Sequence, residues 1–188
     1  MPEDPHASVI AMDAEPGTEP LSWDEVRQRL AAERSYWVAT TRRDGRPHVR
    51  PVLAVWVSGK IYSTTSPGAA KGRNLELRPE CSVTARGPAF DIVVEGSTAW
   101  VEDRHLLEQV ASAYDSKYSW PLTITKENMF DAPYGAPTAG PAPYRAYEIT
   151  PRLVYAFGTG DNLGVRSTRF TFPAYEHAAN DAAQSRRI

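Results

Sequence analysis

Runs in which apolar and polar residues alternate are spread along most of the chain, and they predict a mainly β protein. The first two, Ser35 to Arg42 and His48 to Val57, are separated by the turn residues Asp44-Gly45-Arg46-Pro47. A third run, Lys60 to Thr65, follows Ser58-Gly59. Because side chains alternate between the two faces of a strand, such runs are typical of half-buried strands. We predict three antiparallel strands in a meander.

Four later runs also have strand character. Glu80 to Arg86 and Phe90 to Glu102 flank a turn, and Tyr144 to Ile149 and Arg152 to Phe157 flank Thr150-Pro151. Many short antiparallel strands favour a small β-barrel, because closure of a sheet removes its exposed edges.

Three stretches predict helices. Ser22-Trp23-Asp24-Glu25 is a capping box and opens a helix that runs to about Arg34. A short helix carrying Lys71 stops near Arg78-Pro79, because proline disfavours helix at the residue before it. Asp103 can cap a third helix. Its apolar residues recur at helical spacing and predict core packing: Leu106, Leu107, Val110, Ala111 and Tyr114.

The length of 188 residues suits one domain with a sizeable core. Residues 1–20 are rich in Pro, Glu, Asp and Ala and are predicted to be a disordered lead. We place the domain at residues 21–172 and a mobile polar tail at 173–188. Residues 118–143, with many Pro, Gly and Ala, are expected to form a long irregular loop, and loops of this length are commonly functional or disordered.

Composition excludes several classes of function. A formal net charge of −2 gives no electrostatic reason to expect a nucleic-acid or anionic-membrane partner. No apolar run approaches the length of a membrane span. The single cysteine, Cys81, rules out an internal disulfide, and the four histidines lack metal-ligand spacing. We therefore expect a cytoplasmic protein without a metal site.

The segment Thr64 to Leu75 carries the strongest chemical signal. It leaves the third strand at Thr64-Thr65-Ser66 and opens the helix that carries Lys71 and Arg73. A helix start presents free backbone N–H groups and the positive end of the helix dipole. Hydroxyls and cations beside it suit a phosphate group, although the spacing of a P-loop is absent. The alternative is an ordinary solvated helix start.

Several short motifs follow one another in a characteristic order: Thr41 to His48, Tyr62 to Thr65, Lys71 to Leu75, Pro79, Asp91 to Gly96 and Thr168 to Phe170. This order resembles the FMN-binding split-barrel superfamily, which includes pyridoxamine 5′-phosphate oxidase and related flavin/deazaflavin oxidoreductases. The resemblance covers roughly Leu21 to Phe172. It implies a mainly β fold with a few helices, a split β-barrel of Greek-key type, and a homodimer with two cofactors in grooves between the subunits.

The resemblance also implies roles for individual residues. Lys71 matches the phosphate-binding lysine, and Tyr62 to Ser66 match the strand end that lines the ring and ribityl chain. Arg50 lies where the oxidases hold the flavin, with a surface salt bridge as its alternative role. Alternation puts Arg50 on one face with Val52, Ala54 and Trp56. The expected cofactor-binding residues are Arg50, Val52, Tyr62, Ser63, Thr64, Thr65, Ser66, Lys71, Arg73, Asn74 and Asp91.

Three departures bear on the choice of cofactor. Ala70 stands where the oxidases carry an arginine, and Asp91 stands where they carry a glutamine. Their C-terminal arginine–histidine pair has no counterpart in Arg166 to Arg169. The Ala-Lys-x-Arg-Asn-Leu sequence is more similar to the branch in which coenzyme F420 often replaces FMN, and there Arg73 supplies a second cation. We expect F420 or FMN, with F420 favoured.

The function implied is a flavin- or F420-dependent oxidoreductase that transfers hydride between the bound cofactor and a small organic substrate. An FMN-dependent oxidase and a non-catalytic flavin- or F420-binding protein are the alternatives. A haem-binding protein with His48 as axial ligand is a third. No catalytic side chain is predicted, although Tyr118 and Trp120 are candidates for the substrate side.

Overall fold

The computed structural model describes residues 4–12, 14–135, 140–159 and 166–173. The chain divides into two compact units. The first comprises Met1–Glu33, Thr84–Glu95 and Pro151–Ile188, and the second comprises Arg34–Val83 and Gly96–Thr150. The predicted tail lies almost wholly outside the described residues.

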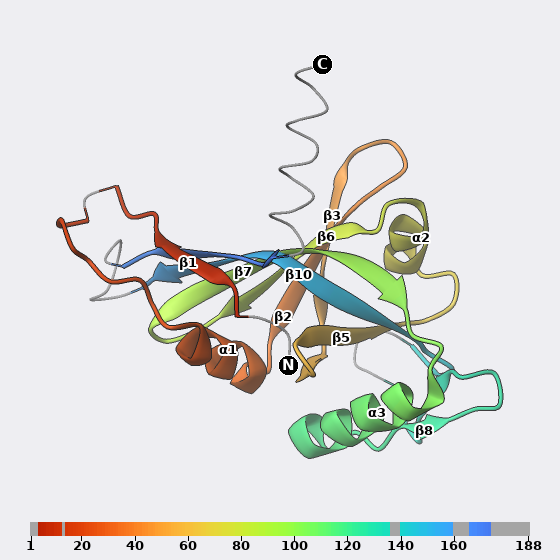
Figure 1. Cartoon of the computed structure of the whole chain (residues 1–188). Helices are drawn as coiled ribbons and strands as arrows, with labels where there is room; N and C mark the ends of the chain where they lie inside the picture. The colour runs from red at the N-terminus through yellow and green to blue at the C-terminus, as the bar shows by residue number, and fades with distance from the viewer. Residues whose placement is uncertain (1–3, 13, 136–139, 160–165, 174–188) are drawn as a thin grey trace. The chain divides into compact units, whose positions relative to one another are not determined.

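The described part of the chain forms three helices and eleven strands, and its strand pairs are antiparallel (Figure 1). The helices are α1 Trp23–Ala32, α2 Ala70–Leu77 and α3 Arg104–Tyr118. The strands are β1 His6–Val9, β2 Tyr36–Thr41, β3 Pro47–Val52, β4 Ala54–Val57, β5 Lys60–Thr65, β6 Glu80–Arg86, β7 Phe90–Trp100, β8 Thr123–Ile124, β9 Phe130–Asp131, β10 Arg145–Gly158 and β11 Thr168–Thr171. This confirms the mainly β fold with a few helices. None of the helices in the described ranges combines the length and apolar character needed to cross a membrane.

In the first unit, β11 lies between β1 and the C-terminal part of β10. The capping box at the start of α1 is confirmed, since Ser22 Oγ accepts a hydrogen bond from Glu25 N at 3.2 Å. Trp23 packs its ring 5.3 Å from the ring of Phe170. The disordered lead predicted for residues 1–20 is wrong at β1, where His6–Val9 pairs with β11. Local composition carries no signal for this pairing, because its partner lies far along the chain.

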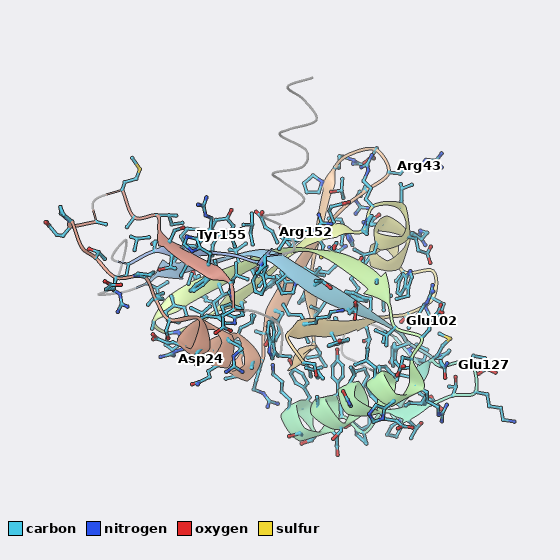
Figure 2. The ribbon with its side chains drawn as sticks, in the orientation of Figure 1. Asp24, Arg43, Glu102, Glu127, Arg152 and Tyr155 are labelled. Atoms are coloured by element: carbon cyan, nitrogen blue, oxygen red, sulfur yellow. The ribbon has the colours of Figure 1, made fainter. Side chains whose placement is uncertain are left out.

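In the second unit, β2 and β3 form the predicted hairpin, with Tyr36 opposite Val52 and Thr41 opposite Pro47. Gly45 in its turn has a φ of 87°, in the left-handed region that glycine enters without strain. Figure 2 shows the neighbouring Arg43 at the tip of this hairpin. β5 pairs on one side with β4 and on the other with the N-terminal part of β10.

The run from His48 to Val57 is two strands and not one. It breaks at Leu53, whose carbonyl oxygen accepts hydrogen bonds from Ser63 Oγ and Tyr114 Oη, each at 2.9 Å. These two side-chain donors thus bond the carbonyl oxygen that would otherwise accept a hydrogen bond from a neighbouring strand. The alternation predicted from Arg50 to Trp56 is interrupted there, so Arg50 is exposed while Ala54 is buried.

The two strands predicted around Thr150-Pro151 are one continuous strand, β10. Its pairing with β5 ends at Ile149, and its pairing with β11 begins at Leu153. Pro151 falls between the two registers, so its missing N–H removes no hydrogen bond from either. In the predicted loop 118–143, β8 and β9 form a short hairpin, and residues 136–139 lie outside the described residues.

The core of the second unit is aromatic. The apolar stripe of α3 packs into it as predicted, with Leu107, Val110 and Tyr114 fully buried. The Trp120 ring lies 5.6 Å from that of Tyr114 and 5.4 Å from that of Tyr144. α3 contacts β4 and β8, and Figure 1 shows β8 alongside the helix.

Two small residues of this unit are tightly enclosed. A Cβ added at Gly96 would lie 2.4 Å from the backbone oxygen of Thr150, so only glycine allows β7 to approach β10 this closely. Cys81 in β6 is buried, and burial, with a smaller effect of the Glu80 charge, raises the pKa of its thiol to about 12.

Candidate functional site

A cavity of about 510 Å³ lies within the second unit, where the inner face of the β2–β3 hairpin meets the end of β5 and the start of α2. Three of the residues that line it are cations, and none of the described lining residues is Asp or Glu. The lining residues are Arg34, Ser35, Tyr36, His48, Arg50, Pro51, Val52, Leu53, Thr64, Thr65, Ser66, Ala69, Ala70, Lys71 and Trp120.

The turn from β5 to α2 forms one wall. Thr64 and Thr65 are buried at the end of β5, and the chain reaches Ala69, the N-cap of α2, within four residues. No side chain caps this helix, and the first hydrogen bond back into it runs from Arg73 N to Ala69 O at 3.1 Å. The backbone N–H groups of the first turn therefore lack helical partners, and with the positive end of the dipole they favour an anion.

Lys71 is the central cation of the cavity. Its Nζ donates to Thr64 O at 2.7 Å and lies 5.3 Å from the centre of the Tyr147 ring. Neither contact supplies a negative charge, and burial lowers the pKa of the ammonium to about 8. An anionic ligand would supply the missing counter-charge and stabilise the protonated form.

Two arginines stand at the exposed rim. The Arg50 guanidinium donates to Val49 O at 2.9 Å. The Arg34 guanidinium lies 5.2 Å from the centre of the Tyr118 ring and donates to Lys117 O. Neither guanidinium forms an ion pair with a carboxylate of the described residues. The cavity is therefore strongly favourable to negative charge.

His48 is a buried polar residue of the same wall, with 5% of its surface exposed. Its Nδ1 lies 3.4 Å from Thr40 Oγ1, which accepts a hydrogen bond from Asn74 Nδ2 at 2.9 Å. Burial lowers the pKa of the imidazole, and the charges of Arg50, Arg42 and Lys71 lower it further. His48 is therefore neutral near pH 7.

Six of the expected cofactor-binding residues come together in this cavity. They are Arg50, Val52, Thr64, Thr65, Ser66 and Lys71.

The other five lie elsewhere. Tyr62 and Ser63 are in the core, because β5 is paired on both sides and only its last residues reach the cavity. Arg73 is exposed and donates a hydrogen bond to Gly68 O. Asn74 is buried and donates a hydrogen bond to Thr40 Oγ1. Asp91 belongs to the first unit, where its buried Oδ1 has no hydrogen-bond partner among the described residues.

Sequence reasoning missed Arg34, Tyr36 and Leu53 as parts of the wall, and it considered His48 only as a haem ligand. The hairpin pattern contained a signal for His48 and for Tyr36. His48 shares a strand face with Arg50 by alternation, and the hairpin register places Tyr36 opposite Val52. Trp120, a candidate for the substrate side, does line the cavity, and its indole N–H donates to Tyr134 O at 3.2 Å.

Comparison with solved structures places this architecture among known folds. An FAD-binding protein from Mesorhizobium loti is 20% identical with a TM-score of 0.53, and the match covers 80% of this chain and 93% of that one. A haem-binding protein from Mycobacterium smegmatis is 18% identical with a TM-score of 0.62, over 84% of this chain and 60% of that one. An F420 reductase is 19% identical with a TM-score of 0.50, and the match covers 72% of this chain and 98% of that one.

No curated protein matches the sequence. The family model for pyridoxamine 5′-phosphate oxidase, however, matches residues 22–158. This match spans well over half of the chain and contains the β2–β3 hairpin, β5 and α2, which build the cationic cavity. The chain therefore belongs to the pyridoxamine 5′-phosphate oxidase family.

Proposed function

We propose that the cavity binds the anionic tail of a flavin or deazaflavin, and that the protein is an oxidoreductase transferring hydride between this cofactor and a small organic substrate. One observation carries the proposal: Arg34, Arg50 and Lys71 converge on a cavity whose described lining contains no carboxylate. Family membership and the likeness to proteins named FAD-binding and F420 reductase support it.

The cavity suits such a molecule in size and chemistry. Its volume of about 510 Å³ falls within the roughly 300–1,000 Å³ typical of small-molecule sites. Lys71 and the first-turn amides of α2 would hold a phosphate, while Thr64, Thr65 and Ser66 offer hydroxyls beside it. When bound, the cofactor's ring system supplies the hydride transfer itself. The role of the protein is to orient the ring and to exclude water.

Of the two rings, we favour F420. Ala70 lines the cavity where the FMN-dependent oxidases carry an arginine, and this removes one phosphate contact expected for FMN. FMN with oxidase chemistry is the alternative. Arg73, expected to supply a second cation, lies outside the cavity lining, so Arg34 and Arg50 take over that role in our proposal.

Parallel titrations with F420 and FMN test the proposal. We expect saturable binding of at least one of them, seen as a change in cofactor fluorescence, and tighter binding of F420. Absence of binding for both would refute the function. Stopped-flow reoxidation of the reduced complex by candidate acceptors separates an enzyme from a cofactor store, because a store would show no acceptor-dependent oxidation.

We also propose that the protein is a homodimeric split β-barrel. The outer face of the β2–β3 hairpin presents Trp37, half exposed, and Val49, which is 45% exposed. Trp37 lies opposite Pro51, a rim residue of the cavity. A second copy covering this face would bury these apolar side chains beside the cofactor groove.

Replacing Trp37 by glutamate should dissociate the dimer. A buried, unpaired charge at an interface costs several kcal/mol, so we expect a shift to monomer in sedimentation velocity at micromolar concentration. Lys126→Glu, which changes an exposed residue between β8 and β9, is the control and should leave the wild-type dimer intact. A monomeric wild-type protein would contradict the proposal.

A haem-binding function is the second candidate, and His48 is the observation that favours it. A neutral imidazole in a cavity, with its other nitrogen held by a hydroxyl, has the arrangement of a metal-ligating histidine. Haem titration would then give a Soret band that is lost in His48→Ala.

A further inference from the structure

The hydroxyl of Thr40 is the side-chain group that contacts His48 Nδ1, and its other hydrogen bonds bear on which ring nitrogen carries the proton. A hydroxyl has one proton to donate and two lone pairs to accept with. Thr40 Oγ1 donates to the backbone oxygen of His48 at 3.3 Å and accepts from Asn74 Nδ2 at 2.9 Å. With the hydroxyl proton directed to this backbone oxygen, the group left for the second lone pair is His48 Nδ1, at 3.4 Å, and that contact then requires a hydrogen on Nδ1. This arrangement of the three side chains favours the Nδ1–H tautomer.

The neighbouring charges favour the same tautomer. Arg50 and Lys71 line the cavity with His48, and together with Arg42 they disfavour positive charge on its ring. A lone pair on Nε2 is attracted to these cations, whereas an N–H there would be repelled. Thr40 and Asn74 are not part of the cavity lining, so Nδ1 faces away from the cavity. The opposite edge of the ring, with Nε2, is the edge available to a ligand.

His48 Nε2 differs from the other polar groups of the cavity lining. The three cationic side chains and the first-turn amides of α2 can only donate hydrogen bonds, and the lining hydroxyls can donate or accept, whereas a bare Nε2 can only accept. They recognise the anionic part of a ligand. A ligand that also carries an uncharged N–H or O–H group needs an acceptor, and the imidazole supplies one among the buried lining side chains.

We propose that His48 Nε2 is a specificity-determining acceptor, which binds an uncharged N–H or O–H donor of the same ligand whose anionic group lies at Lys71. This inference rests on the proposed function. In a flavin or a deazaflavin the donor is either the imide N–H of the ring or a hydroxyl of the polyol chain. Thr40 and Asn74 are positioning residues, because they act on the ligand through His48.

Two substitutions separate the nitrogens of the ring. In His48→Gln the longer side chain keeps an acceptor oxygen near the position of Nε2, whereas His48→Asn keeps a polar group only near Nδ1. A hydrogen bond of roughly 1.4 kcal/mol corresponds to a tenfold change in Kd. We therefore expect about tenfold weaker FMN binding in His48→Asn by fluorescence titration, and near wild-type binding in His48→Gln. Equal affinity of wild type and His48→Asn would overturn the proposal, as would equal weakening in both variants.

N3-methyl FMN, which lacks the imide proton, identifies the donor. If the imide N–H is the donor, wild type and His48→Asn bind this analogue equally. If the difference between them persists, a polyol hydroxyl is the donor; either result supports the acceptor role.

The tautomer can be tested without any ligand. Long-range ¹H–¹⁵N correlation spectra of the wild-type protein should show His48 protonated at Nδ1 and bare at Nε2, and the reverse assignment would overturn the inference. Failure of the proposed function is a different result, because wild-type protein would then bind neither FMN nor F420. A Soret band lost in both His48 variants would assign Nε2 to iron and would also overturn the proposal.

Discussion

Lys71→Met should abolish tight cofactor binding and at the same time make the ligand-free protein more stable. The ammonium is buried with a backbone carbonyl and an aromatic ring as its partners, and burial lowers its pKa to about 8. Methionine fills similar space without charge. A charge-assisted hydrogen bond contributes about 1.5–3 kcal/mol, so affinity for F420 or FMN should fall about 10- to 100-fold. The free energy of unfolding should rise by about 1–3 kcal/mol, since one pKa unit corresponds to about 1.4 kcal/mol.

The two effects depend on pH in predictable directions. Lys71 loses its charge as pH rises through about 8, so wild-type affinity for the anionic cofactor should fall above that pH. In the unfolded chain the pKa of the lysine is near its ordinary value of 10.5. The folded state therefore binds fewer protons between about pH 8 and 10.5, and its stability relative to the unfolded state rises across this window. The methionine variant should lack both contributions.

Arg73→Met is the matched control, because Arg73 lies on the same helix but is exposed and outside the cavity lining. It should bind cofactor with wild-type affinity in the same titration. If Arg73→Met weakens binding as much as Lys71→Met does, or if Lys71→Met binds normally, the phosphate site is wrongly assigned. Urea unfolding of both variants measures the stability change.

Gly96→Ala should be among the most destabilising single substitutions in the second unit. The new Cβ would lie 2.4 Å from Thr150 O, a backbone atom that cannot rotate away, and 3.2 Å from Ile149 Cγ2. Relief requires β7 and β10 to separate. Overpacking commonly lowers the free energy of unfolding by about 1–3 kcal/mol. For a clash with a backbone atom we expect a loss of about 3 kcal/mol or more.

Urea denaturation compares this variant with Ser97→Ala, which changes the next residue of β7 without adding volume. We expect the midpoint to drop sharply for Gly96→Ala and to stay near wild type for Ser97→Ala. A Gly96→Ala protein within about 0.5 kcal/mol of wild type, the range of ordinary surface substitutions, would show that the strands can move apart.

Local chemistry made much of the fold predictable. The capping residues Ser22 and Asp103 and the Asp44-Gly45 turn act within a few residues of themselves, and the helices and the hairpin follow from them. The corrections concern partners that are distant in sequence. The break at Leu53 depends on Tyr114 and Ser63, and no pattern near Leu53 encodes it.

Local sequence also accounts for the part of the candidate site in which the residues are close along the chain. Thr64, Thr65, Ser66 and Lys71 are close in sequence, and a strand leading into a helix brings them to one point. Tyr62 lies in the core and not in the cavity lining, because β5 is paired on both sides, and this pairing is a tertiary feature. Trp120 reaches the cavity through the packing of α3 against β4, which the sequence pattern does not specify. Arg34 directly precedes β2, and its contacts with Lys117 and Tyr118 of α3 join residues that are distant in sequence.

The buried Cys81 allows exposure of strand β6 to be measured chemically. Alkylating reagents attack the thiolate, and a thiol whose pKa is raised to about 12 by burial is almost entirely protonated at neutral pH. Because the chain has one cysteine, any thiol alkylation must occur at Cys81 in β6 after local or global exposure of that strand. The rate of mass increase in iodoacetamide therefore measures how often this strand is exposed, and a ligand that binds only the folded protein slows it.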